Sequence, residues 1–297
     1  MKRAMMAFGA VLLCANAAHA DQEIQWKQVV NVPKGANQPQ GVSVDILGLE
    51  LGDTYAQAKA KLEKLAAETG TPKASAPPTS AAAMMQRQLG QMSGAADDAR
   101  PLREVVNTMR LQTPGGFLTA SYTGQIHLER KLPGSTPQGI RESIQVWLSA
   151  PSSGHQVIGV VRSMTFYENA DQPRVSELIA RLSEKLKTRP QVFERKFRFQ
   201  YNDGQAYVPP NPTVITCSVD MSANSPDAAR NANRQGNCDV ILDVSVGPGI
   251  SEDHAKSLEF TLSDNERTRQ NVSADFQFFS NYARSLQSAP GGAGPKL

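Results

Sequence analysis

The sequence predicts an α+β protein, in which about three helices pack on one face of a largely antiparallel sheet. Three observations predict this class. Segments with the alternation of a β-strand outnumber helical segments, and only three segments repeat apolar residues at helical spacing. Neighbouring strand segments are separated by short turns, which suits antiparallel pairing. The pattern is typical of helices laid on a sheet, either as one domain or as two similar halves.

The first strand and helix are expected in the N-terminal part of the core. A strand is expected at 41–51, and a helix directly follows it. Thr54 and Gln57 have the spacing of a capping box, in which each side chain accepts a hydrogen bond from the other residue's backbone amide. Apolar residues then recur at spacings of four and three, which places them on one helical face. These residues are Leu51, Tyr55, Ala58, Leu62 and Leu65. Gly70 and Pro72 end the helix.

Most strand-like segments follow residue 102. We expect strands at 105–111, 117–122, 126–132, 140–148, 156–167, 192–201, 213–220, 238–246 and 257–262. Residues 151–154 mark a hairpin turn, and the Asn-Asp-Gly of residues 202–204 is a strong turn signal. A second helix begins at Pro173, a favoured first helical residue, and a third is expected at 265–286.

The chain divides by composition into five parts. Residues 1–20 have the features of a secretion signal. Residues 70–101 are rich in Ala, Pro, Ser, Met and Gln and contain one leucine, so they bury little apolar surface and are expected to form a flexible insertion. The core is expected in 21–69, which carries the first strand and helix, and in 102–287. The Gly- and Pro-rich residues 288–297 are expected to be a disordered tail.

The N-terminus has the three parts of a cleavable signal peptide. Lys2 and Arg3 are followed by the apolar run 4–15 and by the A-x-A cleavage site of residues 18–20. We expect cleavage after Ala20 and a periplasmic location. The apolar run is too short to span a bilayer and no other run is apolar enough, so no transmembrane segment is expected after cleavage.

Two cysteines remain after cleavage, Cys217 and Cys238. In an oxidising compartment an isolated pair at this spacing predicts a structural disulfide, because redox sites usually use C-x-x-C and zinc sites need more ligands nearby. A lipid anchor on Cys14 is the alternative to cleavage, although Leu13 replaces the small residue expected before a lipid-bearing cysteine. Cleavage leaves 29 basic residues (31 minus 2) against 28 acidic ones, and this balance, together with export, argues against nucleic acid as a partner.

The stretch VDILGLELGDTYAQA, which begins at Val44, resembles a motif of uncharacterised periplasmic proteins of proteobacteria. Their pattern is roughly D-x-x-G-x-x-L-G, followed by a capped, Ala-rich helix. The strand around Arg162, the helix after Pro173 and residues 262–264 are similar as well. The pattern is also distantly similar to small modules of outer-membrane assembly lipoproteins and to β-lactamase-inhibitor-like domains, which act by binding other proteins. The resemblance implies an envelope protein with a binding-type fold, from which the insertion at 70–101 and the missing lipid cysteine depart.

The sequence carries no catalytic signature. It lacks G-x-S-x-G, a serine three residues before a lysine, and H-E-x-x-H, and the histidines of the mature chain, His127, His155 and His254, are isolated. Basic residues cluster in 181–198. They are Arg181, Lys185, Lys187, Arg189, Arg195, Lys196 and Arg198. This cluster is interpreted either as a site for an anionic partner, such as anionic lipid or lipopolysaccharide, or as the solvated side of one helix and one strand.

From the sequence we therefore expect an exported, non-catalytic module of the cell envelope that binds an envelope protein and needs no cofactor or metal. Two alternatives stay open. A hydrolase of unrecognised type would require the three histidines to converge on carboxylates. A small-ligand carrier would require an apolar pocket between the sheet and the helices.

Overall fold

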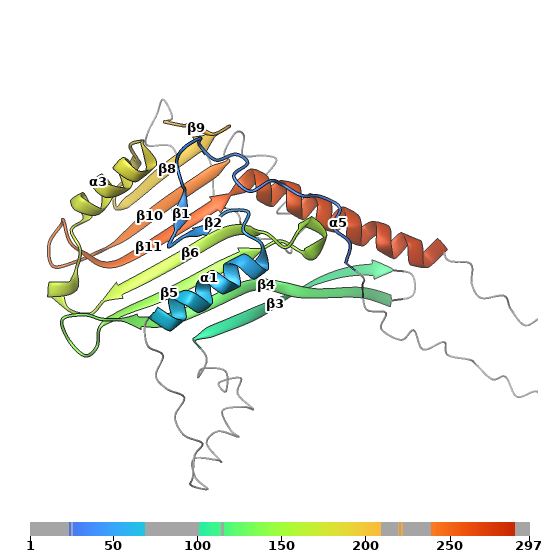
Figure 1. The fold of residues 1–297 in the computed structure, drawn as a ribbon, viewed down its shortest axis with the longest axis horizontal. Coiled ribbons are helices and arrows are strands. Elements are labelled where there is room, and N and C mark those ends of the chain that lie inside the picture. The colour runs from blue at the N-terminus through green and yellow to red at the C-terminus, as the bar shows by residue number, and fades with distance from the viewer. Residues whose placement is uncertain are drawn as a thin grey trace, which may run out of the picture.

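The computed structural model describes residues 24, 26–68, 101–113, 116–208, 219, 221 and 239–288 (Figure 1). Its elements are β1 (Asp45–Ile46), β2 (Leu49–Glu50), α1 (Tyr55–Glu68), β3 (Leu102–Thr113), β4 (Gly116–Leu132), β5 (Ile140–Leu148), the 3-10 helix η2 (Pro151–Ser153), β6 (Val157–Phe166), η3 (Asn169–Asp171), α3 (Val175–Leu186), β7 (Gln191–Phe193), β8 (Lys196–Asn202), β9 (Gln205–Ala206), β10 (Val240–Pro248), β11 (Ala255–Asp264) and α5 (Asn265–Ser288). None of these helices is both long and apolar enough to cross a membrane.

One large antiparallel sheet dominates the fold. Its strand order is β3-β4-β5-β6-β11-β10-β8-β7, and the short β9 pairs with β8. All of its pairings are antiparallel, while β1 and β2 form a separate small hairpin. The expected α+β class with a largely antiparallel sheet is confirmed.

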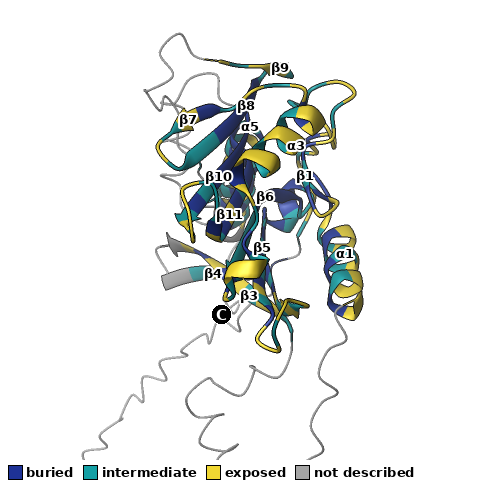
Figure 2. Cartoon of the chain, turned by 90° about the vertical axis from the view of Figure 1, so that its left-hand side faces the viewer, coloured by how far each residue is buried: buried dark blue, intermediate teal, exposed yellow. Residues whose placement is uncertain are grey.

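The helices lie on both faces of the sheet. The main core packs α1, α3 and the β1–β2 hairpin against one face, from which Val146, Leu242 and Leu262 point inward. Figure 2 shows the sheet nearly edge-on, with α1 and α3 on the same side. The apolar side chains of α5, such as Val272 and Phe279, join separate clusters with residues of the opposite face, such as Ile158. The expectation that all three helices pack on one face is therefore wrong for α5.

The sheet consists of two similar halves. The order β3-β4-β5-β6 in the first half matches β7-β8-β10-β11 in the second, and the halves meet where β6 pairs with β11. In that pairing Arg162 lies opposite Phe260, with three further residue pairs on either side. Each half therefore contributes its last strand to the seam. The two halves are related by an approximate two-fold axis through this seam, as in an isologous dimer.

Hydrogen bonds repeat between the halves in detail. The amide of Tyr55, at the start of α1, donates to the carbonyl of His155 at 2.8 Å, and that of Val175, at the start of α3, donates to Asp253 at 2.7 Å. In both cases the acceptor precedes the last strand of the same half. The β5–β6 and β10–β11 hairpins also carry a register shift at the same place, just before their turns. The two halves therefore share the same pattern of helix contacts and register shifts.

Four of the expected strands differ from the observed ones. Segment 41–51 contains a hairpin rather than one strand, because Leu47 and Gly48 adopt positive φ angles of 54° and 78°. Segment 192–201 likewise forms β7 and β8, which are separated by a turn with Glu194 at φ 51°. Conversely, 117–122 and 126–132 belong to the single strand β4, which bulges near Gly124. A Cβ at Gly124 would lie 2.1 Å from the side chain of a neighbouring asparagine on β3, so glycine is needed there.

Candidate functional site

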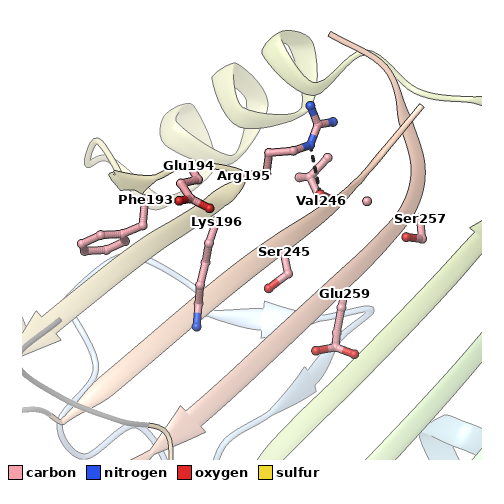
Figure 3. A pocket seen from close by; sticks show the side chains of 9 residues that line it. Phe193, Glu194, Arg195, Lys196, Ser245, Val246, Ser257 and Glu259 are labelled. Carbon is pink, nitrogen blue, oxygen red and sulfur yellow. Dashed lines mark hydrogen bonds between the residues drawn. The ribbon is translucent and has the colours of Figure 1, made fainter. Parts of the chain in front are cut away.

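The second half of the sheet presents a solvent-facing hollow on the face opposite α1 and α3. Along β10, Val244 and Val246 point into the main core, so Ser245 between them points the other way. Lys196 of β8 and Glu259 of β11 share this outward orientation (Figure 3). Together with the β7–β8 turn and the start of β11 they line a shallow hollow of about 350 Å³. The hollow is a polar surface built from β8 and from the β10–β11 hairpin, which follows much later in the sequence.

Charges within the hollow are partly balanced. Asp243 of β10 accepts two hydrogen bonds from the guanidinium of Arg198, at 2.7 and 2.8 Å, and Lys196 Nζ lies 2.8 Å from the same carboxylate. Arg198 is buried, whereas Lys196 keeps about a third of its side chain exposed. Ser163 of β6 donates to the exposed Glu259 at 3.3 Å. The hollow thus offers the ammonium group of Lys196 and the carboxylates of Glu194 and Glu259 to a partner.

Backbone contacts hold the rim of the hollow in place. Arg195, in the β7–β8 turn, donates to the carbonyl oxygens of Val246, Glu252 and His254 at 3.2 to 3.3 Å. It therefore ties its own turn to the β10–β11 turn. At the edge of the hollow, a Cβ on Gly247 would lie 2.1 Å from the hydroxyl of Ser257, so a larger residue there would have to displace that side chain.

The corresponding surface of the first half is covered. The last pair before the register shift is Gly247 opposite Ser257 in the second half and Trp147 opposite Gly159 in the first. Trp147 packs with Ile158 and the α5 residues Val272 and Phe276. A Cβ on Gly159 would lie 2.1 Å from the sulfur of Met221, so this glycine is covered as well. At the register shift, the second half is therefore uncovered and borders the hollow, whereas the first half is covered by α5.

The basic cluster predicted from the sequence is divided between the two faces of the sheet. Lys185, on α3, forms a 2.8 Å ion pair with Asp45, and Lys187, just after α3, donates to the carbonyl of Gly41 at 3.4 Å. Arg181 and Arg189 lie exposed in and after the same helix. The remaining members belong to β8 or the turn before it: Arg195 and Lys196 line the hollow, whereas Arg198 is buried against Asp243. Three of the seven residues, Lys185, Lys196 and Arg198, contact carboxylates.

The three histidines have separate partners. His155 Nε2 lies 2.6 Å from the carbonyl of Thr123, and burial lowers the pKa of this histidine. His127 Nε2 lies 2.7 Å from the side-chain oxygen of Gln125, and burial lowers its pKa as well. His254 Nδ1 lies 2.7 Å from a serine hydroxyl in the β10–β11 turn. Within the described part of the chain, each histidine has a different hydrogen-bond partner, and no three metal-ligating side chains come together.

The sequence does not reveal two buried carboxylates, one at the end of β11 and one on α5. Asp264 ends β11 and binds the guanidinium of Arg267 at 3.2 Å, and Arg267 also donates to the carbonyls of Val32 and Pro33. Burial raises the pKa of Asp264 to about 6. A Cβ on Gly52 would lie 3.0 Å from this guanidinium. These contacts fasten the N-terminal segment to the start of α5.

Asp275 makes the second such anchor, in the middle of α5. It accepts hydrogen bonds from the amide of Ala150 at 3.0 Å and from the hydroxyls of Ser152 and Ser153 at 2.6 and 2.9 Å. Burial raises its pKa to about 6. The sequence gives little sign of this contact, because the serine-rich turn and Asp275 lie more than 120 residues apart.

The chain was also compared with known proteins. No protein-family model, curated protein or solved structure matches it. The predicted disulfide partners Cys217 and Cys238 lie outside the described residues, so their pairing stays a prediction. Two described residues between them lie on the α5 face of the sheet: Val219 packs on Ile241, and Met221 on Gly159.

Proposed function

We propose that this protein is an exported, non-catalytic interaction module of the cell envelope, which binds an envelope protein through the hollow of its second half. The observation that carries the proposal is the bare, polar strand surface around Ser245 and Glu259, next to the register shift at which α5 covers Trp147 and Ile158 in the first half. Serine hydroxyls, one ammonium and two carboxylates suit a polar protein surface of mixed charge.

The rigidity of the hollow supports a binding role. Its floor consists of three hydrogen-bonded strands, and Arg195 fixes its rim through three backbone carbonyls. A site built on strands loses little conformational entropy when a partner binds. The hollow is small and open, so we expect a modest, reversible interaction rather than a permanent complex.

The carrier alternative requires an apolar pocket between the sheet and the helices, here α1 and α3. Side chains of the main core, such as Leu62, Phe199 and Leu262, occupy that space and are buried. The described residues on this side pack as a core, so a ligand carried there would have to displace it. We therefore propose the protein-binding role over the carrier role.

Photo-crosslinking in the envelope tests the proposal. A photoreactive residue at Ser257 should capture one specific envelope protein, whereas the same probe at the exposed Ser121 of β4 should not. The charge reversal Glu259→Lys should abolish capture at Ser257. The matched control Glu63→Lys changes an equally exposed glutamate on α1 and should leave capture intact.

Several results would contradict the proposal. Capture of the same proteins from Ser257 and Ser121 would show that the hollow is not selective. Equal effects of Glu259→Lys and Glu63→Lys would place the interaction elsewhere. N-terminal sequencing of the protein from a periplasmic extract tests export separately, and a first residue other than Asp21 would contradict cleavage after Ala20.

A further inference from the structure

The two edges of the large sheet differ strongly. One edge is interrupted, because β7 has three residues and β9 two. The other edge is β3, with twelve residues in one run. Among the described strands, β3 pairs with β4 alone, along the whole of its length. Its second edge therefore offers a long row of backbone donors and acceptors.

One face of β3 is fixed by packing, and the other is exposed. Asn107 and Met109 are buried toward the α5 side, where Met109 joins the cluster that contains Phe279. The alternating residues Val106 and Thr108 are exposed, and Val106 is 61% exposed. β3 is thus held in an extended conformation with a β-branched apolar side chain facing solvent. Such an edge is a template for a further strand.

The charges on β3 favour a second copy of the same strand. In antiparallel self-pairing centred on Asn107, Glu104 of each copy lies opposite Arg110 of the other, and Val106 lies opposite Thr108. Shifting the register by one residue in one direction puts Arg103 opposite Arg110, and opposed like charges destabilise a strand pair. In the Asn107-centred register, Glu104 of one copy and Arg110 of the other therefore attract each other.

Glu104 is held in one position by hydrogen bonds within its own chain. It accepts hydrogen bonds from Tyr55 and Lys59 of α1 at 2.7 and 2.8 Å and from Thr123 of β4 at 3.0 Å. Hydrogen bonds from Lys59 lower the pKa of Glu104, so its carboxylate stays charged at neutral pH. The guanidinium of an approaching Arg110 would meet a carboxylate held in one position.

We propose that two copies of this protein associate through β3, in an antiparallel pair centred on Asn107. The interface is isologous, and it extends one sheet into the next across a two-fold axis. The seam of β6 and β11 within the chain already joins two half-sheets in the same manner. The hollow of the second half lies at the other end of the sheet order, so dimer formation leaves it accessible.

The molar mass of the mature full-length protein in solution tests the proposal. Light scattering after size exclusion should show a dimer that dissociates on dilution. Arg110→Glu should raise its dissociation constant about tenfold or more, because two attractive pairs become repulsive. Arg103→Glu is the matched control and should leave the dimer unchanged, because Arg103 faces Leu111 in this register. The double change Glu104→Arg with Arg110→Glu should restore association.

Disulfide crosslinking gives a readout that does not depend on the charge variants. The double variant Val106→Cys/Thr108→Cys should form a covalent dimer under mild oxidation, and Val106→Cys alone should not, because it faces Thr108 of the other copy. A monomer at every concentration would overturn the proposal, including the case in which another segment of the chain covers β3. A dimer that is insensitive to Arg110→Glu, or equally weakened by Arg103→Glu, would also overturn it.

Discussion

The two halves of the sheet share one frame and differ in what covers them. At the register shift before the turn, the first half places Trp147 and the bulged Ile158 against α5. The second half has Gly247 and the exposed Lys256 at the same positions. The helix that follows each half also differs in its place: α3 follows β6 and packs on the main-core face, whereas α5 follows β11 and turns back over the first half.

This difference shows that the strand frame does not decide where a surface is left for a partner. Pairing, turn position and helix entry are the same in both halves. A few outward side chains decide whether a half accepts α5 or faces water, since an outward-facing tryptophan and isoleucine favour a helix and a glycine and lysine do not. The predictions below test this comparison in order of decreasing effect.

The largest effect is expected from Arg267, which joins the start of α5 to the N-terminal segment. Arg267→Ala leaves Asp264 as a buried, uncompensated carboxylate and removes the donor to the carbonyls of Val32 and Pro33. We expect the free energy of unfolding to fall by about 3–5 kcal/mol, measured by urea denaturation. The control Arg269→Ala removes a partly exposed arginine on the same helix and should change stability by about 0.5 kcal/mol or less. Similar losses for both variants would contradict the anchoring role.

A comparable loss should follow from uncovering the first half. Phe279→Ala removes a buried α5 side chain from the cluster with Met109 and Tyr122, and should lower the free energy of unfolding by about 3 kcal/mol. Phe193→Ala, at the edge of the bare hollow, should lower it by about 1 kcal/mol or less. If both changes cost the same in urea denaturation, the two halves are not covered differently.

The pH dependence of stability distinguishes the buried, hydrogen-bonded Asp275 from the ion-paired Asp53. The pKa of Asp275 is raised to about 6 by burial, above its unfolded value of 3.8, so this group stabilises the fold most below pH 4 and loses that contribution as pH rises toward 6. The free energy of unfolding of the wild type, relative to that of the Asp275→Asn variant, should therefore decrease over this window by up to about 1.4 kcal/mol per pH unit. Urea denaturation at several pH values measures the difference.

Asp53 should behave with the opposite sign. Burial alone would raise its pKa, but hydrogen bonds from Lys34 and Lys61 outweigh burial and lower it. Its contribution is therefore present above pH 3.8 and is lost as pH falls through its folded pKa. The difference between wild type and Asp53→Asn should shrink on acidification. Curves with the same sign for both aspartates would contradict these assignments.

The smallest effects concern the starts of the two helices. Thr54 and Gln57 form a local capping box on α1, so Thr54→Ala should cost about 1 kcal/mol. α3 has no side-chain cap of its own; instead Asp253, from the β10–β11 turn, accepts hydrogen bonds from the amide and hydroxyl of Ser176 at 2.8 Å. Asp253→Ala should destabilise the protein at neutral pH but not below the pKa of the carboxyl. Thermal unfolding at neutral and acid pH distinguishes the two caps, and a loss that persists for Asp253→Ala in acid would rule out a charged cap.

Local chemistry made much of this fold predictable. The capping box of Thr54 and Gln57, the turn at 151–154 and the turn at 202–204 are all present, and the helix expected at 265–286 is α5. Each depends on residues that are neighbours in sequence. The β1–β2 and β7–β8 turns were missed because the apolar alternation continues through them, and neither Leu47 nor Glu194 is a residue that signals a left-handed conformation.

The site was harder to predict because it depends on strand pairing. Ser245, Ser257 and Lys196 become neighbours only through the register of β8, β10 and β11, which periodicity does not reveal. The apolar stripe of α5 predicts burial but not which face of the sheet receives it. The basic cluster is continuous in sequence, yet Lys185 and Lys196 lie on opposite faces, because α3 packs on the main-core face and the Lys196 side chain of β8 points to the other face.

The position of α5 also has a consequence for how the chain folds. Arg267 contacts residues 235 positions earlier, and the β6–β11 seam joins strands about a hundred residues apart. Contacts of such sequence separation delay folding, because the intervening chain must be ordered before they form. During synthesis, the first half cannot bury Trp147 under α5 until almost the whole chain has emerged from the ribosome, so the nascent chain stays incompletely folded to a late stage.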